Sequence, residues 1–270
     1  MKTHQELLDE IARTQPGAGE LTFWWLGQLS YVVKAGGRTL YFDPYLAPSP
    51  RRNTPPLLTP DEVTNADWVF GSHDHGDHID PATIPGIAAA SPNARFVCSR
   101  VARQKMLSLG VPDERIVALD DGLSYEEDGL RISAIAALHE FFDRDEELGY
   151  PYLSFIVETG GVTIYHSGDT LVYDGMLAKL SKWSFDVMFL PINGRDAERF
   201  ARNIQGNMTF QEAVDMVGTL KPRLAVPGHY DMFTGNLANP KDFTRYMDVK
   251  YPDVSYWVGG HGEAVTLPPR

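Results

Sequence analysis

The stretch Ser72-His73-Asp74-His75-Gly76-Asp77-His78-Ile79-Asp80 decides how the rest of the chain is organised. It brings three imidazoles and three carboxylates together within nine residues, directly after the apolar run Trp68-Val69-Phe70. The apolar run predicts a short buried strand, and Pro81 predicts the start of a helix just beyond the cluster. The cluster therefore lies on a loop at a strand end, where a rigid scaffold can aim side chains into a cleft.

The donor chemistry of this cluster favours a metal site. Imidazole and carboxylate without thiolate suit a divalent ion such as Zn, Mn or Fe(II). The alternative is a polar turn whose histidines have no function. Six ionisable side chains crowded behind a buried strand would repel or desolvate one another without a cation, so we favour the metal site.

Length and charge limit the remaining choices. The 270 residues contain 43% hydrophobic residues, which predicts one domain over residues 1–270, with residues 1–20 as a peripheral N-terminal helical segment. The net charge is −12, so nucleic acid, which needs a basic face, is not an expected partner. Cys98 is the single cysteine, and we find neither an apolar leader nor a bilayer-length run. A reducing cytoplasm fits this pattern, with no membrane partner.

The segment before the cluster reads as a helix followed by strands. Residues 5–13 predict a short amphipathic helix, and residues 22–34 and 38–42 predict strands joined by a hairpin turn. Gly27-Gln28 interrupts the first strand and indicates a bulge or a turn. The loop 44–60 contains six prolines together with Arg51 and Arg52. It is either a stiff solvated connection or one wall of a substrate cleft in which an arginine meets an anion.

After the cluster, strands and helices alternate. The expected strands are 95–98, 115–118, 123–126, 130–138, 153–158, 162–165, 186–190, 224–226 and 254–258, and the expected helices are 100–109, 209–219 and 240–248. Thr209 and Glu212 form a capping-box pattern at the start of one helix. Further histidines follow these strands or lie in glycine-bordered loops: His139, His166, His229 and His261. We expect them to converge on one rim, with the roles of His166 and His261 left open.

His73-Asp74-His75-Gly76-Asp77-His78 resembles the His-x-His-x-Asp-His signature of the metallo-β-lactamase superfamily. His139, Asp169 and His229 follow in the order and rough spacing of that superfamily, and the match runs from Leu21 to Leu267. Four shorter motifs are similar to the branch that contains ascorbate-6-phosphate lactonase: Ser72–His75, Pro191–Asp196, Gly206–Met208 and His229–Phe233.

The resemblance implies an α/β (α+β) fold, a four-layer αβ/βα sandwich, with its site along one edge of two sheets. It also implies two divalent metal ions, Mn or Zn, with Fe as a third candidate. The implied ligands are His73, His75 and His139 for the first ion, Asp77, His78 and His229 for the second, and Asp169 between the two. Two ions about 3.5–4 Å apart can share a hydroxide and polarise a substrate oxygen. Asp77 is the catalytic candidate, because its carboxylate can orient that hydroxide.

The substrate is expected to be a small anion. Arg195, Arg199 and Arg202 follow the strand 186–190, and a guanidinium fork suits phosphate or carboxylate. The alternative is a salt-bridged surface helix, since Asp196 and Glu198 are interleaved with these arginines. The expected neutral pocket residues are Asn193, Asn203, Tyr230 and Phe233.

These patterns predict a metal-dependent hydrolase, specifically a lactonase for a phosphorylated or acidic sugar lactone such as L-ascorbate 6-phosphate. A phosphodiesterase or nuclease of the same fold and a non-hydrolytic di-metal protein are the alternatives. The sequence leaves open the natural substrate, the metal, and whether the chain works as a monomer or a homo-oligomer.

Overall fold

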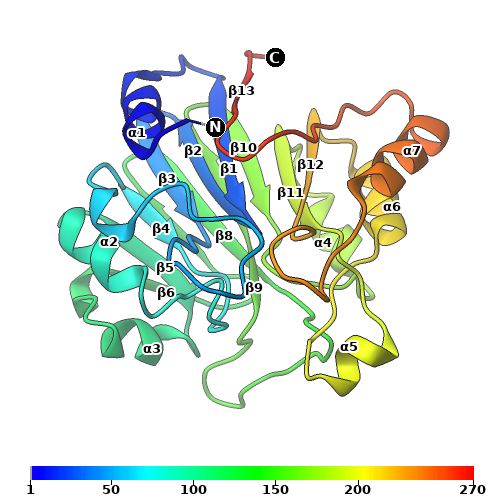
Figure 1. The fold of residues 1–270 in the computed structure, drawn as a ribbon, viewed down its shortest axis with the longest axis horizontal. Coiled ribbons are helices and arrows are strands. Elements are labelled where there is room, and N and C mark those ends of the chain that lie inside the picture. The colour runs from blue at the N-terminus through cyan, green and yellow to red at the C-terminus, as the bar shows by residue number, and fades with distance from the viewer. Residues whose placement is uncertain (1) are drawn as a thin grey trace.

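The computed structural model describes residues 2–270, and within this range two β-sheets pack face to face (Figure 1). The first sheet has the strand order β13-β1-β2-β3-β4-β5-β6, and the second has the order β12-β11-β10-β9-β8-β7. The strands of the first sheet are β1 (Leu21–Gly27), β2 (Ser30–Ala35), β3 (Arg38–Phe42), β4 (Trp68–Phe70), β5 (Arg95–Ser99), β6 (Ile116–Leu119) and β13 (Ala264–Leu267). Those of the second are β7 (Ser124–Glu127), β8 (Leu130–Ala136), β9 (Leu153–Thr159), β10 (Val162–His166), β11 (Val187–Pro191) and β12 (Leu224–Gly228).

Helices cover the outer face of each sheet and complete four layers. Figure 1 shows one group beside the first sheet and another beside β11 and β12 of the second. The first group is α1 (His4–Arg13), α2 (Ile84–Ala90) and α3 (Arg103–Ser108). The second is α4 (Met176–Leu180), α6 (Phe210–Leu220) and α7 (Pro240–Lys250), with α5 (Ala197–Ala201) below them in the figure. Two 3-10 turns lie at Pro60–Glu62 and Asp113–Arg115. The predicted αβ/βα sandwich is confirmed.

Strands β1 to β5 of the first sheet are buried on both faces along nearly their whole length, and their alternating side chains enter different cores. The edge strands β6 and β13 are partly exposed. In β1, Phe23 and Trp25 point into the core between the sheets. Trp24 and Leu26 instead join the helix-covered core, which also contains Leu7 from α1. A strand buried on both sides reads as a continuous apolar run rather than an alternating one. Burial on both faces therefore holds this sheet firmly in the middle of the molecule.

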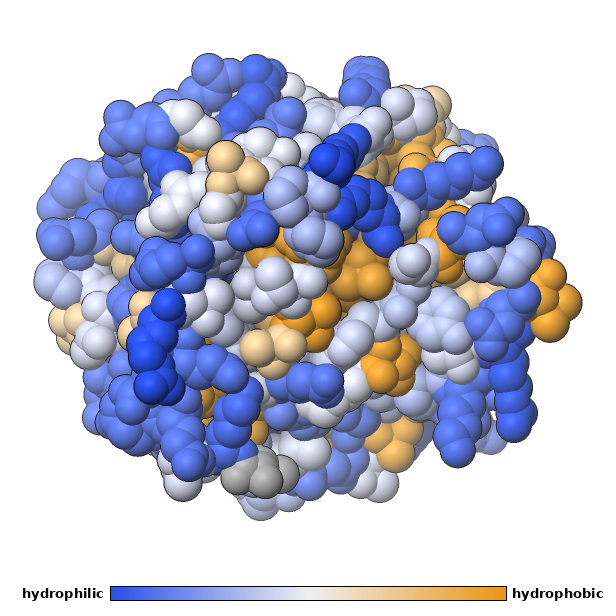
Figure 2. All heavy atoms as spheres, turned by 90° about the horizontal axis from the view of Figure 1, so that it is seen from above, coloured by the Kyte–Doolittle hydropathy of each residue, from blue (hydrophilic) through white to orange (hydrophobic). Residues whose placement is uncertain are grey.

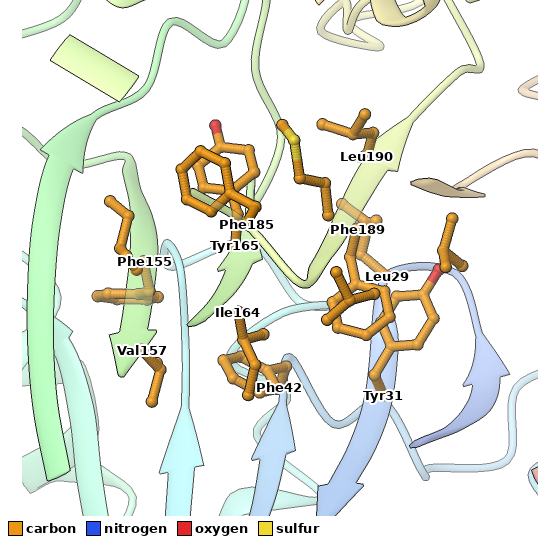
Figure 3. Packing of buried hydrophobic residues seen from close by; sticks show 14 of the residues in the cluster. Leu29, Tyr31, Phe42, Phe155, Val157, Ile164, Tyr165, Phe185, Phe189 and Leu190 are labelled. Carbon is orange, nitrogen blue, oxygen red and sulfur yellow. The ribbon is translucent and has the colours of Figure 1, made fainter. Parts of the chain in front are cut away.

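Aromatic rings fill the space between the two sheets (Figure 3). The rings of Tyr31 and Phe189, one from each sheet, stack with their centroids 4.0 Å apart. Phe42 stacks on Phe70 at 4.5 Å and on the imidazole of His166 at 5.1 Å. Large, well-packed rings hold the sheets in a fixed relative position, so loops from both sheets can share one site.

Four element predictions need correction. Residues 22–34 form two antiparallel strands rather than one, because the backbone reverses at Gly27 and Gln28, with φ of 100° and 54°. Of the two readings of Gly27-Gln28, a bulge or a turn, the turn is confirmed. Residues 254–258 do not form a strand in the described chain; Tyr256 makes an isolated bridge to Ala225. The neighbouring Pro227 lacks an N–H, so this edge of β12 cannot extend the ladder. Pro81 does not start a helix, since α2 begins at Ile84, and α3 is shorter than the predicted 100–109.

The face seen from above in Figure 1 is mostly hydrophilic, with apolar groups between the hydrophilic ones (Figure 2). Among residues 2–270, no helix combines the length and apolar character needed to cross a bilayer.

The capping box predicted at Thr209 and Glu212 is confirmed at the start of α6.

Candidate metal centre

Strand ends from both sheets meet at one edge of the sandwich, and each carries part of a histidine- and aspartate-rich cluster. The loop 71–80 follows β4 of the first sheet. His139 follows β8, Asp169 follows β10 and His229 directly follows β12, all in the second sheet. The cluster therefore lies across the seam between the two sheets.

The first three implied ligands lie together. One side-chain nitrogen from each of His73, His75 and His139 lies within 4.8 Å of the other two. His73 Nε2 and His75 Nδ1 are 3.0 Å apart. Three imidazole nitrogens at such separations can surround one ion.

The second three lie beside them. Ligand atoms of Asp77, His78 and His229 also lie within 4.8 Å of one another. Asp169 Oδ2 is 3.1 Å from His229 Nε2 and 3.4 Å from His78 Nε2. The same oxygen is 3.6 Å from His139 Nε2 of the first group. The structure thus brings all seven implied ligands together, with Asp169 between the two groups.

Buried partners fix the orientation of these imidazoles. Asp43 Oδ2 is 2.6 Å from His78 Nδ1, which leaves His78 Nε2 directed at the cluster. The backbone N–H and hydroxyl of Ser72 donate to the same carboxylate at 2.7 Å. His139 Nδ1 lies 3.0 Å from the carbonyl oxygen of Gly206, to which it can donate. Such partners set the tautomer and raise the basicity of a ligand. Asp43 was not singled out from the sequence, where it only closes a strand.

Burial keeps three histidines neutral. It disfavours the imidazolium form, and neighbouring imidazoles add to the effect. The pKa values fall below the usual value for His75, well below it for His73, and to about 4 for His139. A neutral imidazole has a free lone pair, so these side chains are ready to bind a cation.

In the second group of implied ligands, nearby carboxylates raise the pKa values of the histidines instead of lowering them. Burial alone would lower the pKa of His78, but Asp169 and Asp43 outweigh it and raise the value well above normal. The pKa of His229 rises for the same reason, with Asp169 as the main carboxylate. Burial would raise the pKa of Asp169, yet His229 and His78 hold it well below its usual range. These pKa shifts make His78, His229 and Asp169 a group of paired opposite charges.

Two buried atoms of the cluster fit a bound cation. His78 Nε2 and Asp169 Oδ1 have no hydrogen-bond partner among residues 2–270. Buried polar atoms without partners are rare in folded proteins. Divalent ions coordinated by these nitrogen and oxygen atoms would satisfy both, so the residues present fit the metals that the fold family implies.

A cavity of about 1010 Å³ opens over the cluster. His75, Asp77, His139, Asp169 and His229 form its floor. Its walls come from the loop after β3 and from the segments 203–205 and 233–236. The polar wall residues are Arg51, Asn53, Asn203, Gln205, Thr234 and Asn236. The cavity is large enough for a small molecule that reaches the ligands.

The three predicted anion-binding arginines do not line this cavity in the described chain. Arg195 donates two hydrogen bonds to Glu212, at 2.7 and 2.9 Å. Arg199 pairs with Asp196 at 3.0 Å and donates to the carbonyls of Asn193 and Leu237. Arg202 donates to backbone carbonyls of residues 198 and 235. These guanidinium groups are engaged within the protein, and the pair Arg199–Asp196 is the one ion pair among them that the salt-bridged helix alternative named.

Of the four neutral residues predicted to contact the substrate, two line the cavity and two do not. Asn203 and Phe233 line the cavity. Asn193 is buried and bonded to the side chains of Asn236 and Asn207. The ring of Tyr230 packs against Trp25, with centroids 5.1 Å apart.

The structure distinguishes residues that the sequence left open. Arg52 holds its own loop by donating to the carbonyls of Tyr45, Ala47 and Thr54, whereas Arg51 is exposed in the cavity wall. His166 is buried, with Nε2 2.8 Å from the carbonyl oxygen of Leu29, which gives it a structural contact. His261 Nε2 lies 2.9 Å from Asp231 Oδ2, and Asp231 comes two residues after the implied ligand His229.

Comparison with known proteins gives one family. A family model described as a beta-lactamase superfamily domain matches residues 30–230. A UPF0173 metal-dependent hydrolase of Thermococcus kodakarensis is 30% identical over 247 residues, which cover 91% of this chain and 95% of the relative. A homologue from Archaeoglobus fulgidus is 29% identical, over 89% of this chain and 96% of its own length.

Solved structures share the fold. Igni18, a metallo hydrolase from Ignicoccus hospitalis, superposes with a TM-score of 0.74 at 23% identity, covering 93% of this chain and 100% of its own. An isothiocyanate hydrolase from Delia radicum gut bacteria gives a TM-score of 0.69 at 18% identity, covering 90% and 98%. The diiron β-hydroxylase CmlA from Streptomyces venezuelae gives 0.67 at 16% identity, covering 94% and 55%. At these identities the likeness concerns the fold alone.

Proposed function

The chain belongs to the metallo-β-lactamase superfamily and is a metal-dependent hydrolase of that superfamily, and from this premise we propose that it opens the lactone ring of an acidic, hydroxyl-rich sugar derivative. L-ascorbate 6-phosphate is the model substrate, in keeping with the motifs that resemble the ascorbate-6-phosphate lactonase branch. The reaction adds water across the ring ester and leaves a hydroxy acid.

The observation that carries this proposal is the polar wall above the metal ligands. Four residues with side-chain amides line the cavity: Asn53, Asn203, Gln205 and Asn236. Asn53 donates to the Asp231 carbonyl and accepts from Thr234, and Asn236 accepts from Asn193, so Asn203 and Gln205 are the amides with fewer contacts inside the protein. Amides both donate and accept hydrogen bonds, so they suit the hydroxyl groups of a sugar better than an apolar ligand. Gln205 lines the cavity, and its buried Oε1 has no hydrogen-bond partner within residues 2–270.

Arg51 is the group that suits an acidic substituent. Among the described residues it is the one arginine or lysine in the cavity lining, which also holds three histidines and the carboxylates of Asp77, Asp80 and Asp169. A phosphate or carboxylate in this negative surrounding needs a local cation, and a guanidinium can bind it through two N–H groups. We therefore assign the anion contact to Arg51 ahead of Arg195.

The ligand residues have defined roles in this proposal. His73, His75 and His139 would hold one ion, and Asp77, His78 and His229 the other, with Asp169 shared. When bound, divalent ions supply Lewis acidity and an activated water. Asp77, at the cavity floor, can accept a hydrogen bond from the attacking water and orient it. The cavity walls hold the substrate carbonyl close to this floor.

A hydrolysis panel with Mn- and Zn-loaded protein tests the proposal. It contains an acidic sugar lactone, the matching neutral lactone, a phosphodiester and a β-lactam. We expect the highest kcat/KM for the acidic lactone, at least about tenfold above the neutral one, because a charge-assisted hydrogen bond is lost in the latter. A higher kcat/KM for the phosphodiester would replace the lactonase assignment. Loaded protein that hydrolyses none of the four would favour a non-hydrolytic di-metal protein.

A further inference from the structure

Gln28 lies beside the metal centre although it comes from a turn far away in the sequence. It joins β1 to β2, its side chain is buried, and its φ of 54° is left-handed. Its amide nitrogen is 2.7 Å from Asp77 Oδ2 and 3.0 Å from His229 Nε2. These two atoms belong to implied ligands of the second ion.

The backbone of Gln28 holds the same site. Its carbonyl oxygen accepts hydrogen bonds from the N–H of His229 at 2.9 Å and from the indole of Trp25 at 3.0 Å. His229 is also left-handed, with a φ of 57°. Two non-glycine residues in this sparsely populated conformation are therefore bonded to each other. Such conformations persist where the surrounding structure enforces them, and they cluster at functional sites.

Close packing at Gly228 keeps this contact short. A Cβ atom at position 228 would lie 2.9 Å from the Gln28 carbonyl oxygen and 2.6 Å from the Tyr31 hydroxyl. Glycine therefore lets the end of β12 approach the β1–β2 turn. The turn and the His229 loop behave as one packed unit, and Gln28 cannot drift away from its neighbours without moving both.

We propose that Gln28 is a positioning residue for the second metal ion. Its amide donates to Asp77 Oδ2 and holds that carboxylate beside His229. Without this donor, Asp77 is free to turn toward His78, whose Nε2 is 3.7 Å away. A neutral donor suits this place, because a lysine or arginine would repel the incoming cation. Partners that hold a metal-binding carboxylate commonly affect affinity about ten- to a hundredfold.

This inference rests on the metal centre and not on the lactone substrate, so it can fail independently of the proposed reaction. The variant Gln28→Met keeps side-chain length and removes the donor. Titration of metal-free protein with Mn²⁺ or Zn²⁺, followed by calorimetry, should show affinity for the second ion lowered about ten- to a hundredfold. Affinity for the first ion should stay unchanged, because its implied ligands do not contact Gln28 in the described structure.

A matched control separates positioning from backbone strain. Lys221 is also left-handed, with a φ of 49°, but it lies at the C-cap of α6. Lys221→Met should leave both affinities at parent values. Equal weakening of both ions in Gln28→Met would mean that Gln28 only supports the fold and would overturn the inference. Unchanged second-ion affinity, or a parent protein that binds a single ion, would overturn it as well.

Discussion

Asp169 lies between the two halves of the candidate metal centre. Its Oδ2 lies 3.6 Å from His139 Nε2 and 3.1 Å from His229 Nε2, and so contacts ligands of both proposed ions. We predict that Asp169→Ala lowers affinity for both ions by more than about a hundredfold, beyond what the loss of an outer partner costs. His229→Ala should weaken mainly the second. Metal analysis after reconstitution checks this, and equal metal content in Asp169→Ala and the parent would refute the shared position.

Arg51 and Arg195 are rival candidates for the substrate anion, and they can be separated by one comparison. Arg51 lines the cavity, whereas Arg195 is paired with Glu212. We predict that Arg51→Ala lowers kcat/KM about tenfold on an acidic lactone and leaves the neutral lactone unaffected, since only the former loses a charge-assisted contact.

Arg195→Ala is the matched control and should affect both lactones alike. An anion-selective loss in Arg195→Ala alone would restore the assignment made from the sequence. Metal content should equal that of the parent in both variants, because arginine is not a metal ligand.

At the scale of elements, the end of β12 is the most constrained segment near the site. Gly228 is buried against Tyr31 and the Gln28 carbonyl, with no room for a methyl group. We predict that Gly228→Ala pushes His229 outward and destabilises the protein by about 1–3 kcal/mol, the usual cost of overpacking. Thermal unfolding and metal titration measure the two effects. Gly260→Ala is the control, because a Cβ there meets only Glu263 Oε2, at 3.9 Å. A stable Gly228→Ala protein with normal metal affinity would contradict this reading.

The sequence predicted most elements, and its errors have local causes. Strand β4 and the capping box of α6 follow from apolar runs and a cap pattern that act over a few residues. The sequence marked Gly27-Gln28 as an interruption, either a bulge or a turn, but did not decide between them, because β1 and β2 are both buried on two faces and read as one apolar run. The antiparallel pairing of β1 with β2 decides for the turn.

The metal site shows the same limit of prediction from local sequence patterns. Its implied ligands are recognisable because they follow strand ends in a known order. Asp43 and Gln28 could not be recognised from the sequence. Asp43 contacts His78, 35 residues away along the chain, and Gln28 contacts Asp77, 49 residues away. Arg195 is likewise kept from the cavity by an ion pair with Glu212, which lies 17 residues further along the chain in α6. Distant pairings of this kind leave no local pattern.

At the scale of the whole molecule, Cys98 reports on the integrity of the core. It is buried in β5, and burial raises the pKa of its thiol to about 12. The unfolded thiol ionises near its ordinary value of 9.0, so between that pH and about 12 the unfolded state binds fewer protons than the folded state. This group therefore lowers stability as pH rises through that window.

We predict that the free energy of unfolding falls with rising pH more steeply in the parent than in Cys98→Ala over this window. Denaturant titrations of both proteins at pH 9 and 11 check it. The thiol should also resist a disulfide reagent at pH 8 until denaturant unfolds the chain, because the reactive thiolate is absent. Rapid labelling of the native protein, or equal pH slopes in the two proteins, would show that the core around β5 opens readily.

The cluster lies across the seam, with His73 and His78 from one sheet and His139, Asp169 and His229 from the other. An ion bound there would link the two sheets through its ligands. Without that link, side-chain packing alone holds the sheets together. Ions that bind the folded chain and not the unfolded one shift the balance towards folding, by an amount set by their free concentration. Proteases degrade mainly unfolded chains. The lifetime of this protein in a cell would therefore follow metal supply, with starvation removing the enzyme itself as well as its activity.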